Sequence, residues 1–208
     1  MTQEKLTAKL IKQGYLKTPA IIDAFHAIDR ADFVPSELQN VSYLDHALPI
    51  GHDQTISQPL TVAFMLELLQ PQKGEKILDI GTGSGWSTAL LAHIVGEKGY
   101  VVTAEHIPEL VKMAKKNIGK YDFIKNGTVR IMKKDGSKGY RTAAPYDKII
   151  AAASANEIPK VWMQQVRVGG TIVAPVKNSM VRLHKKSPKA FDKREHFGFS
   201  FVPLVSGV

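Results

Sequence analysis

The sequence predicts an α/β fold with a mostly parallel central sheet, helices on both faces and an antiparallel pair of strands near the C-terminus. Two observations predict this fold. The apolar run Lys76–Ile80 ends in a loop with glycines at positions 81, 83 and 85, and a helical segment follows at once. Beyond this loop, strand-like and helix-like segments alternate at a spacing typical of parallel strands joined by crossover helices.

An N-terminal cap of helices and turns is predicted before the sheet. Apolar residues recur at helical spacing in Thr2–Gln13, and Gly14 ends that helix. Thr18-Pro19 opens a second helix that runs through Ile28, and a third spans Pro59–Leu69. Segments 32–35 and 43–49 are expected to be loops. We therefore expect one domain over residues 1–208, with the cap and a substrate segment in 1–70 and the cofactor-binding core in 71–208.

The core elements follow in order along the chain. Strands are predicted at Ile77–Ile80, Tyr100–Ala104, Thr128–Met132, Lys148–Ala152 and Thr171–Pro175. Helices are predicted at Ser87–Val95, Ile107–Ile118 and Pro159–Gln165. The segments Met180–His184 and Phe197–Pro203 are expected to form the closing antiparallel pair, with a basic hairpin between them.

Composition narrows the class of protein. The chain has 28 Lys and Arg against 19 Asp and Glu, a formal net charge of +9, which can favour nucleic acid or acidic partners. However, the densest basic stretch, Arg182–Arg194, lacks the interleaved aromatic residues of a base-stacking surface. We expect a solvated basic surface and no nucleic-acid partner.

The residue types that are missing also exclude some chemistry. The chain has no cysteine, which excludes disulfides, thiolate metal sites and cysteine nucleophiles, and its seven histidines show no metal-ligand spacing. Residues 1–14 lack the continuous apolar core of a signal peptide, and no window is apolar for long enough to span a membrane. The expectation is a cytoplasmic protein without a metal.

Acidic residues at the ends of the first three strands identify the cofactor class. Glu105 lies 20 positions after Gly85, where a carboxylate can bind a ribose diol. Asp135-Gly136 follows the third strand and is either an adenine contact or only a turn, while Asp79 can orient the glycine loop or meet an ammonium group. The glycine spacing is G-x-G-x-G and not the G-x-G-x-x-G of dinucleotide sites. A ligand with hydroxyls and positive charge, S-adenosylmethionine, fits best.

A second polar segment, Asp45–Pro59, precedes the glycine loop. Ser57 is expected to cap the helix that opens near Pro59. This role is compatible with ligand contact, because Thr55, Ser57 and nearby amides at a helix N-terminus can also hold a carboxylate.

The chain resembles the protein-L-isoaspartate (D-aspartate) O-methyltransferase family from about residue 17 to 205. The resemblance is carried by Gln54-Thr55-Ile56-Ser57-Gln58-Pro59 followed by Ile77–Gly85, with Asp45–Ile50, Asp135–Tyr140, Ala144–Asp147, Ala151–Ala153, Val168–Gly170 and Phe201–Leu204. It implies a Rossmann-like S-adenosylmethionine-dependent methyltransferase fold. Ser57 would be the active-site serine, and Thr55, Ile56 and Ser57 would bind substrate. The predicted cofactor contacts are Asp79, Gly81, Thr82, Gly83, Gly85, Glu105, His106, Asp135 and Gly136.

The resemblance also implies the reaction. A methyl group would pass from S-adenosylmethionine to the α-carboxylate of an L-isoaspartyl residue in a protein or peptide, leaving S-adenosylhomocysteine and an ester that collapses to a succinimide. A monomer without a membrane partner is expected. His52-Asp53 and Val205 depart from the family pattern. The alternatives are a methyltransferase of another substrate, such as RNA, and a catalytically silent cofactor-binding module.

Overall fold

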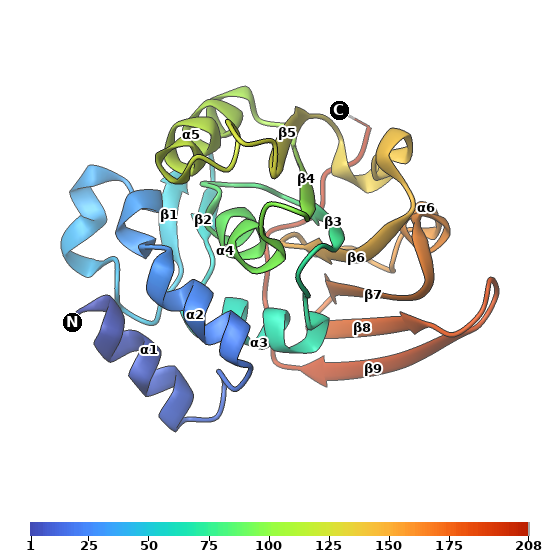
Figure 1. Cartoon of the computed structure of the whole chain (residues 1–208), viewed down its shortest axis with the longest axis horizontal. Helices are drawn as coiled ribbons and strands as arrows, with labels where there is room; N and C mark the ends of the chain where they lie inside the picture. Colours follow the sequence, from blue (N-terminus) through green and yellow to red (C-terminus); the bar gives the residue numbers. More distant parts are fainter. Residues whose placement is uncertain (208) are drawn as a thin grey trace.

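The computed structural model describes residues 1–207 and contains a seven-stranded sheet with the order β5-β4-β3-β6-β7-β8-β9 (Figure 1). Strands β3 to β7 are parallel, whereas β8 is antiparallel to both β7 and β9. The bounds are β3 Lys76–Ile80, β4 Tyr100–Glu105, β5 Val129–Lys133, β6 Tyr146–Ala151, β7 Val166–Val176, β8 Ser179–Lys185 and β9 Phe191–Phe197. The predicted parallel sheet and antiparallel C-terminal strands are confirmed.

Two apolar layers cover the sheet, because successive side chains of each strand point to opposite faces. Ile77 packs into a large cluster with the N-terminal helices, while its neighbour Leu78 packs into a smaller one around Trp162. Helices α3, α4 and α5 contact the sheet on the first face, and α6 carries Trp162 on the second. The helices are α1 Gln3–Lys12, α2 Pro19–Ala27, α3 Pro59–Leu69, α4 Trp86–Val95, α5 Pro108–Ile118 and α6 Lys160–Gln165.

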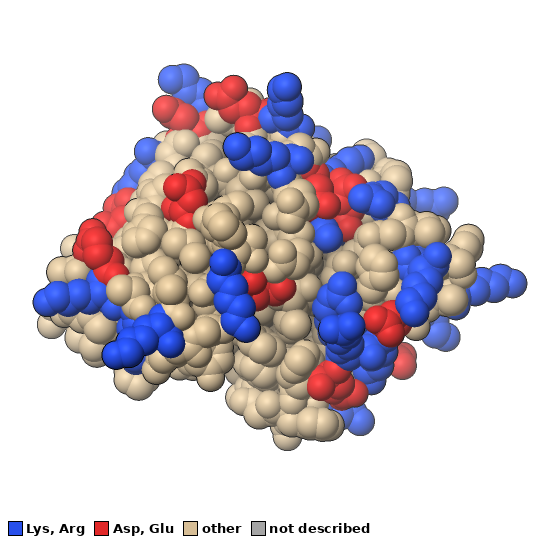
Figure 2. Space-filling view, turned by 60° about the horizontal axis from the view of Figure 1, so that its bottom comes forward, with Lys and Arg blue, Asp and Glu red and all other residues tan. Residues whose placement is uncertain are grey.

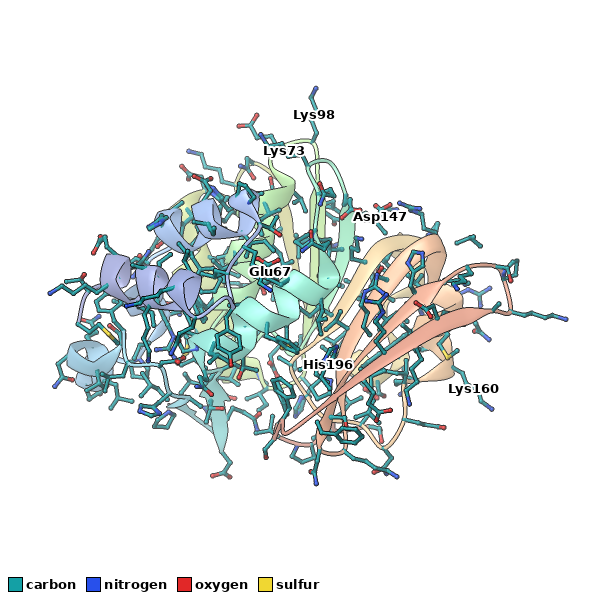
Figure 3. The ribbon with its side chains drawn as sticks, turned by 90° about the horizontal axis from the view of Figure 1, so that it is seen from below. Glu67, Lys73, Lys98, Asp147, Lys160 and His196 are labelled. Atoms are coloured by element: carbon teal, nitrogen blue, oxygen red, sulfur yellow. The ribbon has the colours of Figure 1, made fainter. Side chains whose placement is uncertain are left out.

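The N-terminal cap is tied to the core by polar contacts as well as by packing. Glu67, labelled on α3 in Figure 3, accepts hydrogen bonds from the backbone of Lys17 and Thr18, at 2.7 and 2.8 Å, and from the Thr18 hydroxyl at 2.7 Å. The three hydrogen bonds place the carboxylate at the N-terminus of α2, where the positive end of the helix dipole also stabilises its negative charge. The connection between α1 and α2 is therefore fixed on α3.

The sequence did not reveal the hairpin formed by β1 (Leu48–Gly51) and β2 (Gln54–Ile56) within the cap. Its two-residue turn is His52-Asp53, and both residues have positive φ, 54° and 56°. Such turns favour Asn and Gly, so the usual signal for a hairpin is missing here. The predicted loop at 43–49 consequently extends too far, because residues 48 and 49 already belong to β1.

We expect Asp53→Gly to raise the free energy of unfolding by about 1 kcal/mol, because a left-handed conformation is strained for residues with a Cβ. The side chain of Asp53 is exposed, so little contact is lost. Gly51→Ala is the matched control: Gly51 has φ 87° and open space around its Cβ position, so this change should lower stability by a similar amount. Urea denaturation of both variants measures the two changes in the free energy of unfolding. Changes of the same sign in the two variants would contradict the strain at Asp53.

The last strand differs from its prediction. The segment predicted as a strand at Phe197–Pro203 lies mostly outside the sheet, and β9 is Phe191–Phe197 instead. The basic stretch therefore forms the paired strands β8 and β9 and the turn between them. After Gly198, with φ 97°, the chain leaves the sheet, and Ser154 binds it at Val202 and Leu204 through backbone hydrogen bonds of 2.8 Å each.

Part of the basic stretch serves the fold itself. Lys185 is buried, and its ammonium group donates to the carbonyls of Met163 and Val166, at 2.7 and 2.8 Å. Arg182 donates to the carbonyl of Leu68 at the end of α3. On the face shown in Figure 2, acidic side chains lie among the Lys and Arg side chains. Within residues 1–207, no helix has both the length and the hydropathy needed to cross a membrane.

Candidate functional site

Three adjoining cavities lie at the carboxyl ends of β3, β4 and β6. They meet where the strand order reverses around β3, which is the usual ligand position in open α/β sheets. The inner cavity reaches from Thr55–Ser57 to the glycine loop, and the second runs past Glu105 and His106 to Gly136. The outer cavity, of about 380 Å³, lies between Ser57 and Phe201. Thr55 and Ala152 line all three cavities.

The three glycines of the loop have different roles. All have positive φ: 88° at Gly81, 54° at Gly83 and 99° at Gly85. Gly81 and Gly83 line the inner and second cavities. A Cβ on Gly85 would lie 2.8 Å from the side chain of Ile118, so this glycine permits close packing of α4 on α5. Gly85, predicted as a cofactor contact, therefore has a clear structural function in the loop.

Glu105, at the end of β4, binds the backbone of the glycine loop through its carboxylate. One carboxylate oxygen accepts from the Gly83 amide at 3.0 Å, and the other accepts from the amides of His106 and Ile107, at 2.9 and 3.0 Å. The side chain is only 6% exposed and lines the second cavity. His106 lies beside it, with Nδ1 3.4 Å from the carboxylate. Glu105 thus fixes the loop and retains acceptor capacity for a hydroxyl ligand.

Asp79 lies beneath the loop in a network of hydroxyl groups. It accepts from Thr88 at 2.6 Å and from Thr103 at 3.2 Å, and Thr103 contacts the hydroxyl of Thr82 at 2.6 Å. Complete burial, only partly offset by these hydrogen bonds, raises the pKa of Asp79 to about 6. The nearby carboxylate of Glu105 adds to the rise in pKa. Both Asp79 and Thr82 line the inner cavity.

Asp135 and Gly136 are adjacent but face different surroundings. Gly136 lines the second cavity, and a Cβ there would lie 2.5 Å from Ile80, so only glycine fits without a shift. The carboxylate of Asp135 accepts from the amide and hydroxyl of Ser137 and from the amide of Gly207, and it lines a separate cavity with Lys138. Burial alone would raise the pKa of Asp135, but these hydrogen bonds and the charge of Lys138 together hold it below its usual value. Of the two, Gly136 is the closer match to a predicted cofactor contact.

Ser57 does not cap the helix that follows it, so this part of the prediction is wrong. Helix α3 begins at Pro59 with Gln58 as its N-cap, and the amide of Leu60 donates to Asp45 at 2.9 Å instead. Within residues 1–207, the Ser57 hydroxyl makes no hydrogen bond. Ser57 lines both the inner and the outer cavity. Ile56 is buried and lines the inner cavity, whereas Thr55 is exposed at the rim.

Several lining residues were missed by the site prediction. Trp86 and Met65 form apolar walls of the inner cavity, and Lys134 lines the second. The C-terminal segment contributes Val202–Val205 to the second cavity, which places the unusual Val205 near Glu105. The position of Ala152 directly after β6 could have predicted that it lines the site, because the strand ends of this sheet share one edge. No local sequence pattern indicated that Val202–Val205 line the second cavity. His52 and Asp53 are at the exposed hairpin tip.

These residues fit S-adenosylmethionine. Two buried carboxylates, Asp79 and Glu105, offer acceptors for its ammonium and hydroxyl groups, and they favour its positive charge. The backbone at Gly81 and Gly83 leaves room beside them, and Met65 and Trp86 add apolar surface. Among residues 1–207, no group of three His, Asp or Glu side chains is placed to hold a metal ion.

Comparison with known proteins agrees with this geometry. The family model described as protein-L-isoaspartate(D-aspartate) O-methyltransferase matches residues 1–208. The chain is 40% identical over 207 residues to the protein-L-isoaspartate O-methyltransferase of Ignicoccus hospitalis, covering 98% of this chain and 97% of the relative. It is 43% identical over 201 residues to the enzyme of that name from Staphylothermus marinus, covering 92% and 88%.

Solved structures share the fold over the whole chain. A Plasmodium falciparum protein in complex with S-adenosyl-L-homocysteine superposes with a TM-score of 0.89 at 22% identity, covering 100% of both chains. A structure described as protein-L-isoaspartate O-methyltransferase has a TM-score of 0.88 at 28% identity, covering 99% of this chain and 66% of that one.

Proposed function

Because the chain belongs to the protein-L-isoaspartate(D-aspartate) O-methyltransferase family, we propose that it methylates the α-carboxylate of L-isoaspartyl residues in damaged proteins and peptides. The methyl donor is S-adenosylmethionine, and the product ester would begin repair through a succinimide. One observation carries this proposal most directly. Ser57 lines both the inner cavity, which is also lined by the glycine loop, and the outer cavity.

The acceptor side of the site needs little acid–base chemistry. A carboxylate is already ionised at pH 7, so it can act as the nucleophile without a general base. When bound, S-adenosylmethionine supplies an electrophilic methyl group. The hydroxyl of Ser57 donates a hydrogen bond that orients the acceptor carboxylate, and Thr55 and Ile56 border it. Most of the rate acceleration then comes from positioning.

The donor side is formed by the glycine loop and the acids beneath it. Gly81, Gly83 and Gly136 would leave the backbone room that the cofactor needs, and Glu105 with His106 would bind its hydroxyl groups. Asp79 and Thr82 form the floor of the inner cavity. Gly85 and Asp135 act through the shape of their loops. Trp86 and Met65 keep water from the reacting atoms.

The remaining features of the proposal concern the whole chain. Residues 1–208 would act as one domain, in which the cap of residues 1–70 supplies the acceptor segment and residues 71–208 hold the cofactor. We propose a cytoplasmic monomer that needs no metal and meets its protein substrates in solution. Light scattering after size exclusion tests the monomer.

Matched peptides test the activity. Labelled S-adenosylmethionine is incubated with two peptides that differ only in L-isoaspartate or aspartate, and with RNA in a third reaction. We expect label only on the isoaspartyl peptide, in a base-labile ester. Label on RNA alone would favour a nucleic-acid methyltransferase, and no label in any reaction would favour a silent module.

Ser57→Ala should lower kcat/KM for the isoaspartyl peptide about 10- to 100-fold, because a hydrogen bond to a charged group contributes about 1.5–3 kcal/mol. Binding of S-adenosylhomocysteine, measured by calorimetry, should change little. Ser187→Ala is the control, since Ser187 lies in the turn between β8 and β9. Normal turnover by Ser57→Ala with saturating and limiting peptide would contradict the role of this hydroxyl.

A further inference from the structure

Arg30 is a buried cation beneath the acceptor segment, and it lies outside the motifs that carry the family resemblance. Its side chain is 1% exposed. The guanidinium donates to the carbonyls of Ser42 and Leu44, and to those of His46 at 3.0 Å and Ser57 at 3.2 Å. One side chain therefore joins the loop before β1 to the residue that faces the acceptor.

The same guanidinium also contacts the wall of the inner cavity. Its central carbon lies 5.2 Å from the centroid of the Trp86 ring, a cation–π arrangement. Trp86 and Ser57 both line that cavity. Burial lowers the pKa of Arg30 only to about 10, so the group stays charged at neutral pH. A planar charged group with several donors suits such a multiple contact, and lysine does not replace it.

Asp45 holds the other end of the same segment. Its carboxylate accepts from the amide of Leu60 at 2.9 Å, and it lies near enough to Arg30 to favour the charged guanidinium. The segment Ser57–Leu60 is thus held at its first carbonyl by a cation and at its last amide by an acid. Because the Ser57 hydroxyl makes no hydrogen bond within residues 1–207, its position depends on this backbone.

We infer that Arg30 and Asp45 are positioning residues that set the orientation of Ser57 toward the acceptor carboxylate. Neither touches the reacting atoms. The inference rests on the proposed function, because it assigns the two residues to the acceptor side of that site. It predicts a defect in peptide binding and turnover that leaves the cofactor side intact.

Paired variants at Asp45 separate positioning from charge. Asp45→Asn keeps an oxygen that accepts from Leu60, so KM for the isoaspartyl peptide should stay within about twofold of wild type. Asp45→Ala removes the acceptor and should raise KM about fivefold to tenfold, in keeping with the loss of one hydrogen bond. The dissociation constant of S-adenosylhomocysteine should change less than about twofold in both variants.

Variants at Arg30 separate the contribution of the planar guanidinium, with its several donors, from the contribution of its charge. Arg30→Lys keeps the charge but cannot span the carbonyls, so it should still lower kcat/KM about tenfold, and Arg30→Met should lower it further. Hydrogen exchange of residues 57–66 should quicken in both variants while the amides of β3 and β4 keep their protection. Arg130→Met, on an exposed position of β5, is the control and should match wild type.

The inference is overturned if KM and exchange in residues 57–66 are unchanged in Asp45→Ala and Arg30→Lys. It is also overturned if cofactor affinity and exchange throughout the sheet change together with KM, because that pattern indicates a general loss of structure. Wild-type protein that fails to methylate the isoaspartyl peptide rejects the proposed function instead. In that case, local exchange in residues 57–66 still decides whether Arg30 and Asp45 hold the segment.

Discussion

Glu105→Gln should lower the free energy of unfolding by about 2–4 kcal/mol and weaken the binding of S-adenosylhomocysteine at least about 100-fold. The carboxylate accepts from three backbone amides, those of Gly83, His106 and Ile107, and it is almost fully buried. An amide side chain places an NH₂ group against at least one of these N–H donors. The glycine loop then loses the contact that fixes it on β4.

Chemical denaturation and calorimetry measure the two effects separately. Glu109→Gln is the matched control, because Glu109 lies in the exposed first turn of α5, close in sequence but outside both cavities. The control should keep wild-type stability and affinity. If Glu105→Gln binds S-adenosylhomocysteine normally, the carboxylate serves the fold alone and the proposed ribose contact is wrong.

Glu105 also illustrates what the sequence predicts well. Parallel strands place their carboxyl ends at one edge, so polar residues after β3 and β4 meet even though they are distant in sequence. The pattern of glycines and acids therefore predicts that these residues gather at one edge of the sheet, and in the structure they line adjoining cavities there. What it left open was how each residue acts: Gly85 serves packing against Ile118, and Asp135 is engaged by Ser137 and Gly207.

The acceptor side was less predictable because its contacts come from separate segments. Serine is a residue type that often caps helices, and Ser57 lies two positions before α3. The contact to the Leu60 amide nevertheless comes from Asp45, in the loop before β1. The local sequence pattern does not show which side chain accepts from the first amides of α3, because Asp45 reaches them only through the tertiary structure. Arg30 gave no signal at all, since a single arginine in a helical cap usually points to solvent. Its burial follows from the carbonyls that converge on it.

The end of the chain shows a similar limit. The apolar residues of Phe197–Pro203 are compatible with a strand, but strand pairing also needs a neighbouring edge with matching register. The edge of β8 is taken by Phe191–Phe197, whose charged residues are tolerated at the border of a sheet. The residues that follow are held by Ser154, and Val202–Val205 line the second cavity. Their use as a wall of the site depends on this long-range contact.

Asp79→Asn should make the protein more stable at pH 8 while weakening its function. Burial raises the pKa of Asp79 from 3.8 to about 6 in the folded protein. The protonated side chain therefore contributes stability that is fully present below about pH 4, and this contribution is lost as the pH rises through about 6. A shift of this size corresponds to about 3 kcal/mol, which the folded wild type gives up when Asp79 ionises.

Asparagine has no proton to lose, and its oxygen can still accept from Thr88 and Thr103, the two partners of Asp79. The stability difference between Asp79→Asn and wild type should thus be small at pH 4 and grow to about 3 kcal/mol in favour of the variant at pH 8. Urea denaturation across this range measures the difference, and a pH-independent difference would contradict the raised pKa. At pH 8 the variant should bind S-adenosylhomocysteine at least about tenfold more weakly, since the negative charge that favours the ammonium group is missing. The negative charge of Asp79 that destabilises the folded protein is thus the same charge that would bind the ammonium group of the cofactor.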